Sequence, residues 1–149
     1  MTPHQDGTFL RNDPLKLVGY WFPIDDATLE NGCLWFVPGS HKTPVTRHMV
    51  RNPMYDPQDP GSGESRLIFE GDEYPVYAED QWVAAPCAKG SLVLIHGQVL
   101  HRSAKNTSPH PRHAYTFHMV ETRGCVYRKT NWLQPPKNKS FPKLFETLP

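Results

Sequence analysis

His4 and Asp6 are the first residues of this sequence whose types and spacing could perform chemistry. One residue separates them, so on an extended chain both side chains point to the same face. Two imidazoles and one carboxylate can occupy one face of a ferrous ion and leave its other positions open. The pair therefore predicts a metal site that needs one more histidine from a distant strand. The alternative is an ordinary polar N-terminal segment facing solvent.

Two histidines late in the sequence could complete such a site. His96 ends a run of aliphatic residues directly, and His101 follows a short distance later. An antiparallel barrel can bring either position back beside the first residues of the chain. Spacing alone therefore does not choose between them.

Arg112 and Ser103 could hold a co-substrate such as 2-oxoglutarate. Arg112 follows a turn-like segment at residues 104–111 and begins a strand-like run. Its planar guanidinium can engage a carboxylate through two parallel hydrogen bonds, and a charge-assisted contact of this kind contributes about 1.5–3 kcal/mol. Ser103, two residues after His101, would share its strand face and could donate a further hydrogen bond.

The segments that must position these residues have the pattern of β-strands. Short apolar or alternating runs lie between Gly, Pro, Asn and Asp residues, which is typical of an all-β sandwich or barrel. The 16 prolines are about twice the average usage and indicate many turns. We expect strands at residues 15–21, 33–37, 66–69, 74–78, 91–97 and 113–120. We also expect a long loop at residues 51–65 and a proline-rich tail, residues 133–149, on the surface.

Composition narrows the class of protein. A chain of 149 residues has the length of one domain. Its 16 Lys and Arg nearly balance 15 Asp and Glu, which gives no electrostatic reason to expect a nucleic acid or an anionic membrane as partner. Its apolar runs are too short to span a bilayer and no leader is visible, so we expect a cytoplasmic protein. Cys33, Cys87 and Cys125 lack metal-type spacing and are expected to be reduced thiols.

Three blocks make the sequence similar to a known family. "DATLENGCLWFVPGSH" (residues 26–41), "GSLVLIHGQVLHRSAKN" (residues 90–106) and "RHAYTFHMVE" (residues 112–121) resemble the phytanoyl-CoA dioxygenase family. The likeness runs from the segment around Thr2 to "NWLQP" at residues 131–135, which is nearly the whole chain.

The resemblance implies a fold, a reaction and a set of site residues. The fold would be a double-stranded β-helix of the jelly-roll or cupin type. We expect residues 1–149 to be the C-terminal portion of one such domain, incomplete at its N-terminal strand. The site would hold Fe(II) through His4, Asp6 and His101, and would bind 2-oxoglutarate through Arg112, Ser103 and Trp21. The family pattern thus selects His101 over His96, which would then lie in the core or support a ligand.

The activity that the resemblance implies is that of a non-haem Fe(II) and 2-oxoglutarate-dependent dioxygenase. Such an enzyme uses O2, converts 2-oxoglutarate to succinate and CO2, and oxidises a small organic substrate, here an unknown one that could be acyl-CoA-like. The alternative is a truncated, inactive β-helix domain that binds a metal or a partner. Oligomeric state cannot be read from the sequence.

The remaining histidines and aromatic residues have less specific interpretations. His41 is expected in a structural loop after a strand, and His118 could face either the core or a pocket wall. Trp35 and Phe36 are expected in the core. His48, His110 and His113 are expected on the surface.

Overall fold

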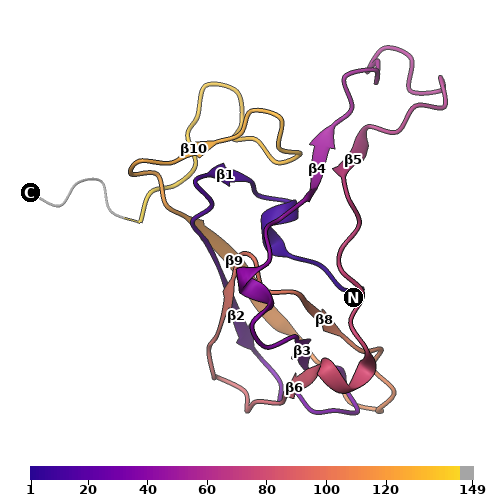
Figure 1. The fold of residues 1–149 in the computed structure, drawn as a ribbon, viewed down its shortest axis with the longest axis vertical. Coiled ribbons are helices and arrows are strands. Elements are labelled where there is room, and N and C mark those ends of the chain that lie inside the picture. Colours follow the sequence, from indigo (N-terminus) through magenta and orange to yellow (C-terminus); the bar gives the residue numbers. More distant parts are fainter. Residues whose placement is uncertain (145–149) are drawn as a thin grey trace, which may run out of the picture.

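The computed structural model describes residues 1–144, and these form antiparallel β-structure without an α-helix (Figure 1). The strands are β1 (Asn12–Asp13), β2 (Leu17–Pro23), β3 (Leu34–Phe36), β4 (Arg47–Arg51), β5 (Leu67–Gly71), β6 (Val83–Ala85), β7 (Val93–His96), β8 (His101–Ser103), β9 (Ala114–Val120) and β10 (Val126–Tyr127). Three single-turn 3-10 helices lie between them, η1 (Asp6–Thr8), η2 (Ser40–Lys42) and η3 (Glu79–Gln81). None of these helices has the length and apolar character to cross a membrane.

The first sheet has the strand order β7-β2-β9, and its central strand shows why one face is buried. Leu17, Gly19, Trp21 and Pro23 are buried, whereas the residues between them are half-exposed. This period of two is that of a strand with one face on a core. In the register of the sheet, Gly19 lies opposite Ile95 of β7 and His118 of β9.

The second sheet has the order β6-β3-β8, and the first residues of the chain lie beside its outer strand. His4 and His101 exchange two backbone hydrogen bonds of 3.0 Å. The Met1 ammonium donates to the Ser103 carbonyl at 3.0 Å, and Ser103 N–H donates to the Met1 carbonyl at 3.2 Å. Residues 1–4 therefore pair with β8 as an extended segment.

The two sheets share one core. Trp21 and Ile95 from the first sheet pack with Leu34 from the second, together with Cys33 and Ala27. Burying this apolar surface is the main force that holds the sheets face to face. The expectation of an all-β fold with a double-stranded β-helix core is confirmed.

Four smaller strands lie outside this core. β4 and β5 pair with each other and project away from the two sheets, with the irregular residues 52–66 at the tip (Figure 1). β1 pairs with β10. The tail follows β10, where the Tyr127 hydroxyl donates to the Leu133 carbonyl at 3.0 Å and the Tyr127 ring meets the Phe141 ring at 5.2 Å. The expected surface tail extends to residues 145–149, which lie outside the described residues.

Several expected elements need correction. The segment at residues 74–78 is not a strand, because it has no pairing partner. Its aromatic residues instead pack irregularly, Tyr74 and Tyr77 on the cluster around Trp82. The strand expected at residues 15–21 instead covers Leu17–Pro23, and β1, β4, β6 and β10 were not anticipated.

Candidate metal centre

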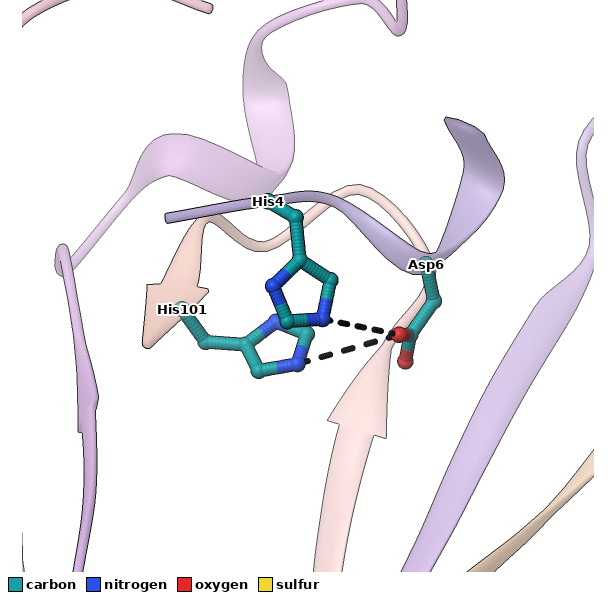
Figure 2. Close-up of side chains that lie close together, drawn as sticks. All are labelled: His4, Asp6 and His101. Atoms are coloured by element: carbon teal, nitrogen blue, oxygen red, sulfur yellow. Dashed lines mark ion pairs between the residues drawn. The ribbon is translucent and has the colours of Figure 1, made fainter. Parts of the chain in front are cut away.

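His4, Asp6 and His101 lie together at one end of the second sheet (Figure 2). The backbone pairing of His4 with His101 places the two imidazoles side by side, with ring centroids 4.2 Å apart. The chain then turns into η1, and Asp6 is its first residue. Asp6 and His101 are buried, and His4 is half-buried.

The segment that carries His4 and Asp6 is fixed on both sides. Gln5, between them, is 2% exposed, and its side-chain amide donates to the Gln98 carbonyl at 2.7 Å. Gly7 N–H donates to the Gly97 carbonyl at 2.8 Å. A terminal segment is ordered when its backbone and side chains are tied in this way. The alternative interpretation, a polar N-terminal segment that faces solvent, is therefore wrong for His4 and Asp6.

The donor atoms converge on one point. Nε2 of His4 and Nε2 of His101 each lie 3.7 Å from Oδ1 of Asp6, and the three ligand atoms are within 4.8 Å of one another (Figure 2). Metal–ligand bonds of about 2.1 Å at right angles would separate two donors by about 3 Å. A small contraction of the observed arrangement would suffice to meet one ion.

The hydrogen bonds of the two imidazoles orient them as ligands. Nδ1 of His4 lies 2.9 Å from the Thr2 carbonyl, and Nδ1 of His101 lies 3.1 Å from the Val99 carbonyl. A carbonyl can only accept, so each Nδ1 carries the hydrogen and each Nε2 turns a lone pair toward Asp6. Two imidazole nitrogens and a carboxylate oxygen then converge at 3.7 Å without a hydrogen bond between them. Such a set of donor atoms fits a metal ion.

The protonation states also suit a metal. Burial lowers the pKa of His101 below its ordinary value, despite the opposing charge of Asp6. Burial alone would raise the pKa of Asp6, but contact with His118 and the charges of His101, His118 and His4 outweigh it, and the pKa lies below its usual value. A neutral imidazole and an ionised carboxylate are the forms that bind metals.

His118 is the neighbour of this site that the sequence did not identify. Its Nε2 lies 3.2 Å from Oδ2 of Asp6, which is buried and has no hydrogen bond of good alignment. The sequence left its role open because finding this contact requires the register between β2 and β9. The alternation in "HAYTFHMV" limits His118 to one of two faces but does not say which face is inner.

Arg112 and Trp21 lie against each other. The guanidinium carbon of Arg112 is 5.5 Å from the Trp21 ring centroid. Within residues 1–144 the Arg112 guanidinium forms no ion pair, and its buried Nε has no hydrogen-bond partner. A half-buried arginine without a counter-charge is a good site for a carboxylate. Ser103 is buried two residues along β8 from His101, opposite Leu34.

Two of the other histidines lie elsewhere than expected. His96 is exposed and is not a core residue, because on β7 the buried Ile95 occupies the inner face. The imidazole of His96 meets that of His41, centroid to centroid, at 5.6 Å. His48 is half-buried, and burial lowers its pKa. His110 and His113 are exposed, as expected.

An apolar cavity of about 250 Å³ lies beside His101. It is bounded mainly by Leu34, Phe36, Ala85, Val93, Ile95 and Val99, with His41 and His96 also on its wall. These residues come from β3, β6, β7 and the segment before β8, so the cavity extends between the two sheets.

The chain matches proteins of one family over most of its length. The model of the family "Phytanoyl-CoA dioxygenase (PhyH)" matches residues 1–114. Phytanoyl-CoA dioxygenase domain-containing protein 1 of Rattus norvegicus is 48% identical over 146 residues, which cover 97% of this chain and 47% of the rat protein. The Caenorhabditis elegans homolog is 44% identical over 147 residues, 98% of this chain and 49% of that protein. The chain spans about half the length of the curated relatives it matches.

Solved structures show the same fold. One is EvdO2 from Micromonospora carbonacea var. aurantiaca, complexed with 2-oxoglutarate. The match covers 87% of this chain and 47% of the EvdO2 chain, with a TM-score of 0.58 and 25% sequence identity. Another is the epimerase SnoN in complex with Fe3+, alpha ketoglutarate and nogalamycin RO. The match covers 95% of this chain and 51% of the SnoN chain, with a TM-score of 0.60. SnoN is 20% identical and supports the fold alone.

Proposed function

The chain belongs to the phytanoyl-CoA dioxygenase family, and on that premise we propose that it acts as a non-haem Fe(II) and 2-oxoglutarate-dependent dioxygenase. The observation that carries the proposal is the convergence of two imidazole Nε2 atoms on one oxygen of a buried carboxylate. These three donor atoms form no hydrogen bond with one another, and a cation between them would be bound by all three.

His4, Asp6 and His101 would hold the metal, and all three are among the ligand types that suit ferrous iron. When bound, the iron would supply open coordination positions for 2-oxoglutarate and O2. The protein's own contribution is to fix the tautomers of His4 and His101 through the carbonyls of Thr2 and Val99. Supporting hydrogen bonds of this kind orient metal ligands and raise their basicity.

Arg112 would bind the carboxylate of 2-oxoglutarate that lies far from the metal. Its unpaired guanidinium offers two parallel donors, and Trp21 forms one wall beside it. Ser103, on the same strand as His101, would donate a hydrogen bond to the co-substrate. In the proposed reaction the 1-carboxylate of 2-oxoglutarate leaves as CO2. One oxygen atom of O2 enters succinate and the other oxidises the substrate.

The substrate would be a small organic molecule with an apolar part. The support is the apolar cavity beside His101, whose volume of about 250 Å³ lies near the lower end for ligand sites. The family description suggests an acyl-CoA, although fold and family do not fix a substrate. Incubating the protein with acyl-CoAs and with free acids, and measuring succinate release, would separate these classes.

An anaerobic titration tests the proposed function. Fe(II) and 2-oxoglutarate added to the protein should together give a visible metal-to-ligand charge-transfer band, which neither compound gives alone. The matched control is His101→Ala, which lacks one imidazole. If the wild-type chain gives no such band, or if His101→Ala gives an equal one, the proposal is wrong.

The second candidate is an inactive β-helix domain that binds a metal or a protein partner. One observation favours it: the outer face of the first sheet exposes aromatic residues, among them Tyr115 at 62% and Phe117 at 37%. Exposed apolar faces of this kind often bind another polypeptide. Equal 2-oxoglutarate turnover by the wild-type chain and His101→Ala would favour this candidate over the enzyme.

A further inference from the structure

We propose that His118 is a positioning residue that holds Oδ2 of Asp6, so that Oδ1 alone is presented to the metal. The inference rests on the proposed function, because it concerns the same site. It adds a residue from β9 to ligands that come from β8 and from the segment beside it.

The two oxygens of Asp6 have different surroundings. Oδ1 faces the Nε2 atoms of His4 and His101 at 3.7 Å. Oδ2 points the other way, toward Nε2 of His118 at 3.2 Å. The Asp6 side chain is only 8% exposed, so Oδ2 has little access to water. A buried carboxylate oxygen needs a donor, and His118 is close enough to provide one.

The sheet register creates this contact. His118 lies opposite Gly19 in the pairing of β9 with β2. A Cβ atom at Gly19 would lie 2.9 Å from Oδ2 of Asp6 and 3.4 Å from Cδ2 of His118. The absence of a side chain at position 19 therefore leaves the space in which the carboxylate and the imidazole meet.

His118 is placed to orient a ligand and not to be one. Its ring nitrogens do not belong to the group of donor atoms that lie within 4.8 Å of one another, which His4, Asp6 and His101 form. The His118–Asp6 contact lacks the alignment of a good hydrogen bond. Contacts around a catalytic site are often misaligned until the ligand is bound.

The consequence of this contact concerns the number of open positions on the metal. A carboxylate can coordinate through one oxygen or through both. If His118 donates to Oδ2, that oxygen is occupied and Asp6 binds through Oδ1 only. One more position on the metal then stays open for 2-oxoglutarate or O2.

Cobalt binding to three variants tests the inference without activity. Co(II) serves as the probe because its visible spectrum reports coordination number and affinity together. His118→Leu should bind Co(II) about 10- to 100-fold more weakly, the usual cost of losing a partner that orients a ligand. Its spectrum should change toward a higher coordination number. His118→Gln should recover most of the Co(II) affinity and most of the wild-type spectrum, because the glutamine amide nitrogen can donate near the position of Nε2. His110→Leu, in an exposed turn, should match the wild type.

The possible outcomes separate this inference from the proposed function. If the wild-type chain binds no Co(II), the proposed function fails and the inference fails with it. If the wild type binds and His118→Leu gives the same affinity and spectrum, only the inference is wrong. Long-range 15N–1H spectra of the unaltered protein provide a test that does not depend on the folding of a variant. The His118 signal, assigned by its loss in His118→Gln, should show hydrogen on Nε2, and hydrogen on Nδ1 alone would overturn the inference.

Discussion

Gly19→Ala is a small change that should act mainly on the metal site. The added methyl group would lie 2.9 Å from Oδ2 of Asp6, 3.3 Å from Cβ of Ile95 and 3.4 Å from Cδ2 of His118. Ordinary contact begins near 3.4 Å, so the first distance must grow by about 0.5 Å. The Asp6 carboxylate is the end of a side chain and can rotate away, whereas Ile95 sits in the core.

The expected magnitudes follow from this difference. Displacing a ligand carboxylate by about 0.5 Å should weaken metal binding by roughly 10- to 100-fold, as the loss of a supporting contact does. Overpacking a core typically lowers the free energy of unfolding by about 1–3 kcal/mol, and the loss in Gly19→Ala should lie near the low end of that range. The assay is Co(II) titration followed by visible absorption, with urea unfolding measured in parallel.

The control for this experiment is Gly61→Ala. A Cβ atom at Gly61 would meet only Asp59 Oδ1, at 3.7 Å, in the loop between β4 and β5. This variant should bind Co(II) as the wild type does. If Gly19→Ala also binds Co(II) with wild-type affinity, the Asp6 carboxylate is not held against Gly19 and the reasoning about this site is refuted.

Three further predictions concern the same site. Arg112→Met should weaken 2-oxoglutarate binding at least tenfold, from the loss of a charge-assisted contact of about 1.5–3 kcal/mol, while Co(II) affinity stays unchanged; isothermal titration would measure both, and equal 2-oxoglutarate affinity would exclude Arg112 as its anchor. Added Fe(II) should raise the melting temperature under anaerobic conditions, and the rise should be lost in His4→Ala; an equal rise in both would place the metal elsewhere. Because burial lowers the pKa of His101 below its value of 6.5 in the unfolded chain, the unfolded state binds more protons, so stability should fall as pH decreases from 6.5. Urea unfolding between pH 7 and 5 should show less of this loss in His101→Gln, and an identical loss would contradict the assignment.

The candidate ligands His4 and Asp6 could be predicted from the sequence because their spacing is a local feature. A histidine and an aspartate one residue apart suggest a shared face, and the structure brings both side chains to one point. The two side chains do not meet by lying on the same face of an extended strand, as expected, because Asp6 is the first residue of η1. The choice of His101 over His96 came from family resemblance. The physical reason appears only in the fold, where His101 pairs with His4, whereas His96, next to the buried Ile95, is exposed.

What the sequence could not supply was register and long-range packing. His118 lies near Asp6 only because β9 pairs with β2 in a register that sets it opposite Gly19. The aromatic residues near Tyr74 favour a strand by propensity, yet the Tyr74 hydroxyl donates to Thr8 at 2.9 Å and the segment forms no ladder. Tertiary contacts override local preference in such short segments.

Iron itself tests the central claim most directly. Crystals of the chain soaked anaerobically with Fe(II) should show one anomalous peak at the iron absorption edge. That peak should lie about 2.0–2.2 Å from Nε2 of His4, Oδ1 of Asp6 and Nε2 of His101. A peak bound by other residues, or no peak at these three while the protein remains folded, would contradict the account.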